Sequence, residues 1–215
     1  MSKSRRKRQV VKDTIYVVCG NTKTEKNYFD HLRKRFNNHL GKMKITTVKL
    51  GDNSSSPASL IKDAKKVIKS DPSIQSCWII CDKDSFDLNA VIDEAKHYNK
   101  TNDTKINVIW SNISFEVWFL YHFQYTTKEM TVKELEKLLS QIISDRLNGL
   151  KKYSKTDIKL FELLQEFEHK AILHSKKSYQ THNRNGKTAN ESCSSTKMFK
   201  FFEFIDYFLE EPPFK

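Results

Sequence analysis

The chain has 215 residues, 38% of them apolar and 12% aromatic, which is long and apolar enough to bury a core and excludes a chain disordered throughout. Its formal net charge of +12 is compatible with a polyanionic partner such as nucleic acid, although charge alone does not identify one. No apolar run approaches the roughly 18 residues of a membrane-spanning helix, and no apolar segment follows the basic start as in a secretory signal. We therefore expect no membrane partner and a cytoplasmic location.

The first twelve residues form a basic segment that contains no acidic residue. Its basic residues are Lys3, Arg5, Arg6, Lys7, Arg8 and Lys12. We predict that residues 1–12 are a flexible tail that attracts polyphosphate, and the alternative is a solvated tail without a partner.

Strands and helices are predicted to alternate through residues 13–125. The strands are expected at residues 14–19, 44–50, 77–81 and 105–110, and the helices from Thr22 to Phe36, from Pro57 to Ile68 and from Leu88 to Tyr98. Three of the four cysteines fall within these strands, where they are expected as small buried hydrophobes rather than as disulfides. Alternation at intervals of about 30 residues is typical of right-handed βαβ units. The sequence thus predicts an α/β core with a mostly parallel sheet and helices on both faces.

The pattern changes after residue 125. Amphipathic helices are predicted over Thr131–Ile143 and Asp157–Leu173, a polar and basic loop over Ser175–Ser194, and a Phe-rich helix over Ser195–Leu209. We therefore divide the chain into the tail 1–12, the α/β core 13–125 and a helical extension 126–215 with a basic loop.

Three carboxylates follow the ends of predicted strands. Asp82 and Asp84 come directly after the third strand, and Glu25 lies just beyond the first. Ligand sites in parallel sheets lie beyond the carboxyl ends of the strands, and nearby carboxylates repel one another unless a cation lies between them. If the two strands are neighbours, the three side chains meet in one crevice and predict a Mg²⁺ or Mn²⁺ site. The alternatives are that the Asp residues cap the next helix and that Glu25 completes a capping box with Thr22.

Two further polar residues lie in the very aromatic stretch from Phe115 to Phe123. Glu116 has apolar neighbours, and because a partly buried carboxylate needs a cation or a hydrogen-bond donor, it is a candidate fourth ligand or base. His122 is a candidate catalytic residue, and the alternative is a core histidine whose hydrogen bonds are satisfied.

A set of basic and aromatic residues in the second half of the chain predicts a nucleic-acid-binding surface. Cations hold phosphates and rings stack on exposed bases, so such a set is typical of proteins that bind single-stranded or looped nucleic acid. The candidates are Lys151, Lys152, Tyr153, Lys155, Lys176, Lys177, Arg184 and Lys187, together with Lys23. The alternative is a plain solvated face.

Taken together, the motifs resemble those of the RloB-like proteins. The matching residues are Cys19, Glu25, Tyr28 and Phe29, then Trp78, Asp82, Lys83, Asp84 and Phe86, then Ser111, Asn112, Phe115, Glu116, Trp118, His122 and Phe123, and finally Tyr153, Lys155, Ser195 and Thr196. These proteins occur in prokaryotic restriction and defence loci and are regarded as Toprim-related. The resemblance implies a Toprim-like core, a divalent metal, and a nuclease role in defence against phage. We expect the substrate to be DNA or RNA, and the basic, aromatic helical extension makes transfer RNA one candidate. An ATPase partner encoded nearby and a homo-oligomeric state are further candidate interactions of such a protein.

By this resemblance Asp82 and Asp84 carry over as metal ligands, and Glu25 matches the family's second glutamate. The family usually has Glu-Gly directly after the cysteine, where this chain has Gly20-Asn21. That difference leaves Glu25 or Glu116 to complete the site, or else leaves a weakened enzyme. A nucleic-acid-binding or sensor module without catalysis is therefore the second hypothesis. A phosphatase of the haloacid dehalogenase type ranks last, because there the Asp pair is expected after the first strand.

Overall fold

The computed structural model describes residues 14–19, 23–38, 44–49, 57–83 and 87–208. The basic tail 1–12, the Gly20-Asn21 step, the predicted cap Thr22 and the candidate ligand Asp84 all lie outside the described residues. The predictions that rest on them therefore stay predictions.

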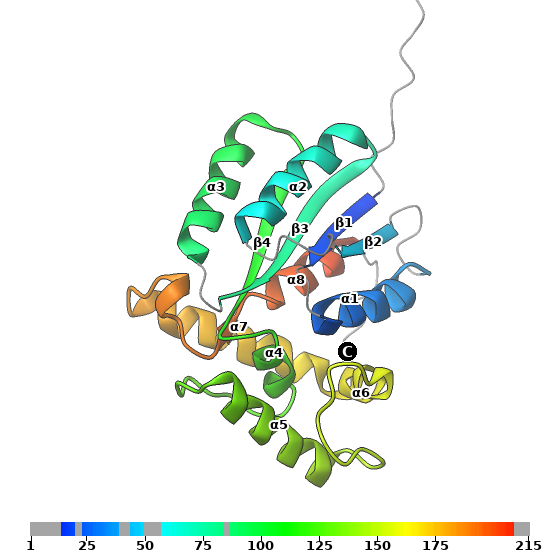
Figure 1. Cartoon of the computed structure of the whole chain (residues 1–215), viewed down its shortest axis with the longest axis vertical. Coiled ribbons are helices and arrows are strands. Elements are labelled where there is room, and N and C mark those ends of the chain that lie inside the picture. The colour runs from blue at the N-terminus through cyan, green and yellow to red at the C-terminus, as the bar shows by residue number, and fades with distance from the viewer. Residues whose placement is uncertain (1–13, 20–22, 39–43, 50–56, 84–86, 209–215) are drawn as a thin grey trace, which may run out of the picture.

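A single sheet organises the described part of the chain (Figure 1). Its strands are β1 (Thr14–Cys19), β2 (Lys44–Lys49), β3 (Ile74–Asp82), β4 (Lys105–Asn112) and β5 (Ser195–Thr196). They lie in the order β2-β1-β3-β4-β5, and all neighbours are parallel except β4 and β5, which are antiparallel. The predicted α/β fold with a mostly parallel, Rossmann- or Toprim-like sheet is confirmed.

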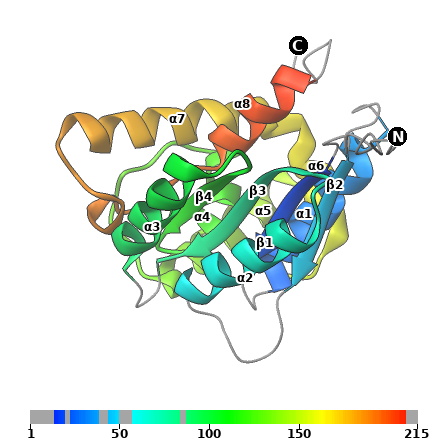
Figure 2. The same cartoon turned by 90° about the horizontal axis from the view of Figure 1, so that it is seen from above.

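Helices cover both faces of this sheet (Figure 2). On one face, α2 (Pro57–Ser70) and α3 (Leu88–Thr101) pack against the strands. On the other face, α1 (Lys23–Phe36) and α8 (Phe199–Phe208) do so. Each helix places its apolar stripe toward the sheet, which is why the amphipathic spacing in the sequence located α1, α2 and α3.

The central strand β3 shows why its sequence is a continuous apolar run. Trp78 and Ile80 enter the core beneath α1 and α8, whereas Cys77, Ile79 and Cys81 enter the core beneath α2 and α3. Successive side chains of a strand point to opposite faces, so a strand that is covered on both sides needs apolar residues at every position. Cys19, Cys77 and Cys81 are free thiols packed in these cores, as predicted.

The remaining helices lie at the end of the sheet to which the parallel strands point. They are α4 (Glu116–Tyr121), α5 (Val132–Arg146), α6 (Ile158–Leu164), the 3₁₀ turn η1 (Gln165–Phe167), α7 (Glu168–Arg184) and the 3₁₀ turn η2 (Ala189–Glu191). A complete capping box between Thr131 and Glu134 begins α5. In the part of the chain that the structure describes, no helix has the length and apolar character to cross a membrane.

The C-terminal part differs from the prediction in two places. The predicted loop over Ser175–Ser194 is wrong in its first half, because α7 continues as a helix to Arg184. The predicted helix over Ser195–Leu209 begins only at Phe199, since Ser195 and Thr196 pair with Asn112 and Ser111 as β5. Residues 195–208 thus form an edge strand of the sheet and a helix on its face, so this segment packs on the predicted core.

Candidate functional site

Three acidic side chains line one small pocket at the carboxyl ends of the parallel strands. Glu25, Asp82 and Glu116 share this pocket, which has a volume of about 130 Å³. Glu25 and Glu116 are each only 2% exposed. Thr24, Ser114, Val132 and Lys155 complete the lining.

The topology explains why residues so far apart in sequence meet here. Strand β3 lies between β1 and β4, and Asp82 at its end pairs with Ser111. Glu25 is in the first turn of α1, which follows β1, and Glu116 begins α4, which follows β4. Because parallel strands end at the same edge, the segments that follow all three strands converge there. Glu25 and Asp82 thus line one pocket, as the strand order requires. Their predicted role as metal ligands stays a prediction.

Glu116 is held by two residues from the loop between α5 and α6. The Tyr153 hydroxyl donates a hydrogen bond of 2.8 Å to Glu116 Oε1, and Lys155 Nζ lies 3.5 Å from the same oxygen. Lys155 also forms an ion pair of 2.8 Å with Glu136. Burial, and then the charge of Glu116, raise the pKa of the Tyr153 phenol far above its ordinary value, so the hydroxyl stays protonated and donates.

Among the described residues that line this pocket, Lys155 is the one with a cationic side chain, and that side chain is 48% exposed. Its burial acts to lower its pKa, but the Glu136 and Glu116 carboxylates outweigh that effect and hold the pKa above its ordinary value. Lys155 therefore stays charged at neutral pH and partly neutralises the acidic pocket.

Two further observations describe the polarity of the pocket. Ser114 is 5% exposed, and its Oγ has no hydrogen-bond partner among the described residues, although it lines the pocket. A buried hydroxyl without a partner is costly and is suited to receive a ligand. The pKa of the Cys81 thiol is raised by burial and then by the charges of Asp82 and Glu25, so this thiol remains protonated beneath the carboxylates.

The described residues do not form a ready-made cage for a metal. No group of three or more histidine, cysteine or acidic side chains among them has that arrangement. Such a cage is not required for Mg²⁺, which commonly binds one or two carboxylates and completes its shell with water and substrate phosphates. The acidic pocket and the Ser114 hydroxyl have the oxygen chemistry that a hard cation needs.

The Ser111-Asn112 pair of the motif has a structural role. The Asn112 amide donates to the backbone carbonyls of Ala189 and Asn190, both at 3.0 Å. Ser111 Oγ and Thr196 Oγ1 lie 3.0 Å apart. The pair therefore fastens the C-terminal segment to the end of β4, directly before the residues that enter the pocket.

His122 lies away from the pocket lining. It is 1% exposed, and its Nδ1–H donates a hydrogen bond of 2.9 Å to the Trp118 carbonyl. Its ring packs edge-on against the Trp118 ring. Burial lowers the pKa of His122 to about 3, so the imidazole is neutral in the folded protein. This is the geometry of the core histidine that the sequence left as the alternative.

The basic candidates fall into three groups. Lys151 and Lys152 are exposed directly before Tyr153, whereas Tyr153 itself is buried with its ring against Phe119. Along and beyond α7, Lys176, Lys177, Arg184 and Lys187 are all exposed. Lys23 begins α1, and its side chain is outside the described set.

Two of these candidates have a second role, and three residues of the pocket lining were not predicted, namely Thr24, Ser114 and Val132. Lys155 lines the carboxylate pocket, and Tyr153 donates a hydrogen bond to Glu116 of that pocket. A buried Tyr153 ring presents no face for stacking on a base. Ser114 was not singled out in the sequence, although it lies two residues before Glu116. Its position two residues before Glu116, just after a predicted strand, could have indicated that it belongs to the site.

The fold and the pocket define an α/β protein with an acidic site at the carboxyl edge of a mostly parallel sheet. A family model described as RloB-like protein matches residues 15–205. The chain belongs to the RloB-like family, which confirms the resemblance. The searches of curated proteins and of solved structures return no significant match.

Proposed function

We propose that the chain is a divalent-metal-dependent nuclease of a prokaryotic anti-phage defence system that cleaves RNA, transfer RNA included, or DNA. The observation that carries this proposal is the convergence of Glu25, Asp82 and Glu116 in one pocket at the carboxyl edge of the sheet. The net charge of +12 supports a polyanionic substrate. The defence role, an ATPase partner encoded nearby, a homo-oligomeric state and a cytoplasmic location are parts of the same proposal, and family membership supports them.

The pocket residues have distinct roles in this proposal. Glu25 and Asp82 would hold Mg²⁺ or Mn²⁺ together with Asp84, which follows two residues later in the sequence. The bound ion supplies Lewis acidity toward a phosphodiester and lowers the pKa of a coordinated water. Tyr153 orients Glu116, and Lys155 places a positive charge where a phosphate enters.

A cleavage assay tests the proposal directly. Purified protein is incubated with a pool of cellular RNA and DNA in Mg²⁺, in Mn²⁺ and in chelator, and the products are sequenced at their ends. We expect cleavage that requires the metal and is lost in Glu116→Gln, which keeps the side-chain shape and an acceptor for Tyr153. If the intact protein cleaves neither nucleic acid with either metal, with and without its genomic neighbour, the proposal is wrong.

Lys155 provides a second prediction about the same pocket. Replacing Lys155 by Met removes a positive charge 3.5 Å from Glu116 and should tighten Mn²⁺ binding, on the order of tenfold, because a unit charge at this range still contributes near a protein surface. Titration of Mn²⁺ followed by electron paramagnetic resonance measures the change. Lys152→Met removes an exposed charge from the same loop and should leave the affinity unchanged. Equal affinities in Lys155→Met and wild type would contradict the prediction.

A nucleic-acid-binding or sensor module is the second candidate function. The observation that favours it is the Gly20-Asn21 step in place of Glu-Gly, together with the Lys155 ammonium that already neutralises Glu116. Binding without cleavage under every metal would favour this module over the nuclease.

A further inference from the structure

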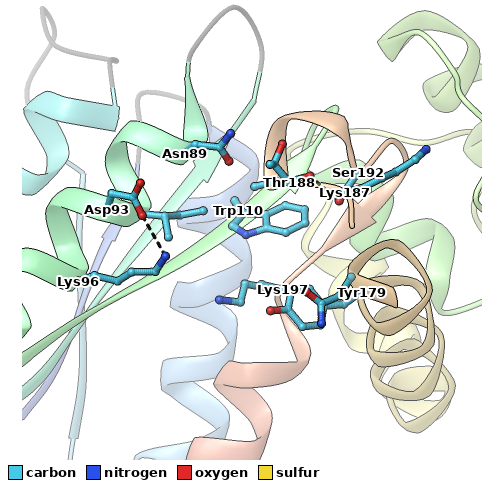
Figure 3. A pocket seen from close by; sticks show the side chains of 12 residues that line it. Asn89, Asp93, Lys96, Trp110, Tyr179, Lys187, Thr188, Ser192 and Lys197 are labelled. Carbon is cyan, nitrogen blue, oxygen red and sulfur yellow. Dashed lines mark hydrogen bonds and ion pairs between the residues drawn. The ribbon is translucent and has the colours of Figure 1, made fainter. Parts of the chain in front are cut away.

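A second and larger cavity lies between α3, α7 and the segment that carries η2 and β5. Its volume is about 440 Å³, within the range of roughly 300–1,000 Å³ that is typical of small-molecule sites. It shares no lining residue with the carboxylate pocket. Trp110 lies at its centre, with Lys96 and Asp93 on one side and Lys187 on the other (Figure 3).

Positive charge dominates the lining of this cavity. Lys96, Lys187 and Lys197 contribute three cations, against the single carboxylate of Asp93. Asp93 pairs with Lys96 at 2.9 Å. Among the described residues, no carboxylate lies within ion-pair distance of Lys187 or Lys197. An anion that enters the cavity therefore meets two lysines that form no ion pair with a described carboxylate, although the charge of Glu191 acts on Lys187 from beyond that distance.

Lys197 is the cation placed most deeply. It is partly buried, and burial, followed by the charges of Lys200 and Lys96, lowers the pKa of its ammonium. Its Nζ lies 5.6 Å from the centre of the Tyr179 ring. Keeping this ammonium charged is therefore unfavourable in the empty cavity, and a bound anion would stabilise the charge.

The rest of the lining is suited to a planar ring. Tyr179 and Trp110 lie with their ring centres 6.3 Å apart, and Tyr179 is only partly buried, so part of its ring faces the cavity. The amides of Asn89 and Asn183 add donors and acceptors at the rim. Aromatic rings that stack and amides that read edges are the groups with which proteins hold nucleobases.

We propose that this cavity binds a phosphorylated nucleoside, with the phosphate at Lys197 and Lys187 and the base against Tyr179. The volume exceeds the need of a phosphate ion, and cations beside an aromatic ring match a phosphate joined to a base. The ligand is a free mononucleotide or the 5′-phosphorylated end of a strand. Both sources present the same chemistry, and Trp110 directly precedes Ser111, which pairs with Asp82 at the carboxylate edge.

The experiment measures binding in chelator, so its result does not depend on catalysis at the carboxylate pocket. The probes are the four ribonucleoside 5′-monophosphates, the four nucleosides, inorganic phosphate, and a short single-stranded RNA with and without a 5′-phosphate. Calorimetry gives the affinities, and quenching of tryptophan fluorescence, measured in a protein whose other tryptophans, Trp78 and Trp118, are replaced by Phe, provides a second readout. We expect binding that requires both base and phosphate, and that weakens at least about tenfold in Lys197→Ala, the loss expected for one charge-assisted hydrogen bond.

Two further variants keep the test sharp. Lys187→Ala changes an exposed lining residue and should also weaken binding without affecting folding. Lys100→Ala removes an exposed charge from α3 outside the cavity and should have no effect. Tight binding of monophosphates identifies a free nucleotide as the ligand, and binding of the 5′-phosphorylated RNA alone identifies a strand end. The proposal is overturned by absence of binding, by inorganic phosphate binding as tightly as the nucleotides, or by equal losses in Lys197→Ala and Lys100→Ala.

Discussion

Replacing Asp82 by Asn is expected to abolish metal-dependent cleavage, with a loss of about 100- to 1,000-fold or more. Asp82 ends the central strand and lines the pocket with Glu25 and Glu116, so the change removes a charged oxygen ligand and preserves the shape of the side chain. A catalytic cation is worth several kcal/mol in the transition state, and each 1.4 kcal/mol is about tenfold in rate. The variant should fold, because removing one of three like charges relieves repulsion.

Cleavage rate and nucleic-acid affinity are measured side by side for this variant. The affinity, from gel-shift titration, should change little, since the exposed basic residues remain. Asp103→Asn is the matched control, because Asp103 is exposed in the turn before β4. Undiminished cleavage in Asp82→Asn would remove Asp82 from the catalytic set. Cleavage of a small phosphomonoester that is lost in this variant would instead favour the phosphatase reading.

Replacing Arg35 by Leu is expected to lower the free energy of unfolding by about 3–5 kcal/mol. Arg35, in the last turn of α1, donates two hydrogen bonds to Glu168 at the start of α7, at 2.6 and 3.1 Å. Glu168 is 2% exposed, so removing its partner leaves a buried charge without compensation. Urea unfolding of both proteins at pH 8 measures the difference.

The loss should become smaller at lower pH. Burial raises the pKa of Glu168 to about 7 even though Arg35 opposes the shift, and the ordinary value is 4.5. In Arg35→Leu the folded-state pKa of Glu168 rises further, so as the pH falls the folded variant takes up a proton before the wild type does. Its deficit therefore shrinks as the pH falls toward about 7, and below that pH, where both folded proteins are protonated at Glu168, the deficit stays constant. Arg33→Leu, which breaks a partly exposed ion pair of 3.6 Å on the same helix, should cost less than about 1 kcal/mol.

A double substitution decides the origin of this loss. Arg35→Leu combined with Glu168→Leu removes both charges and should recover most of the stability. If the double variant is as unstable as Arg35→Leu, the loss comes from packing against Phe36, over whose ring the Arg35 guanidinium lies at 4.2 Å, and the electrostatic account is wrong.

The parts of the fold that sequence predicted are those where burial produces a regular pattern. Strand β3 is apolar at successive positions because both faces are covered, and α1 to α3 have apolar stripes because one side meets the sheet. The meeting of Glu25 and Asp82 follows from the same topology, since both residues come after neighbouring parallel strands.

The second half of α7 was missed because its buried stripe is polar. Ala171, Ser175, Ser178 and His182 lie on one face at helical spacing, and all are buried. Ser175 and Ser178 donate to the carbonyls of Thr196 and Ser194, and His182 Nε2 donates to that of Cys193. These buried side chains form their hydrogen bonds with a segment that is remote in sequence. Because the buried face is polar, the spacing of apolar residues does not predict this half of the helix.

The set of residues that the sequence assigned to the carboxylate pocket was incomplete for a related reason. Tyr153 lies 37 residues from Glu116 in sequence, and the spacing of residues gives no sign that its hydroxyl reaches that carboxylate. Tyrosine and lysine near other basic residues favour a nucleic-acid surface. Only the folded loop between α5 and α6 buries Tyr153 and brings the Lys155 ammonium to the rim of the pocket. This part of the site depends on single hydrogen bonds between residues that are far apart in sequence, which a sequence pattern does not predict.

The edge strand β5 has a consequence for the order in which the molecule forms. Ser111 and Thr196 are 85 residues apart, and every helix from α4 to α7 lies in the loop that their pairing closes. Closing so long a loop costs entropy that only the completed contacts repay, so this pairing belongs to the late steps of folding. A chain still emerging from the ribosome holds Asp82 and Glu116 before it holds Thr196, and so it cannot yet have β5 beside β4. The β5 edge of the sheet, next to the carboxylate pocket, can therefore form only after Ser195 and Thr196 have been synthesised.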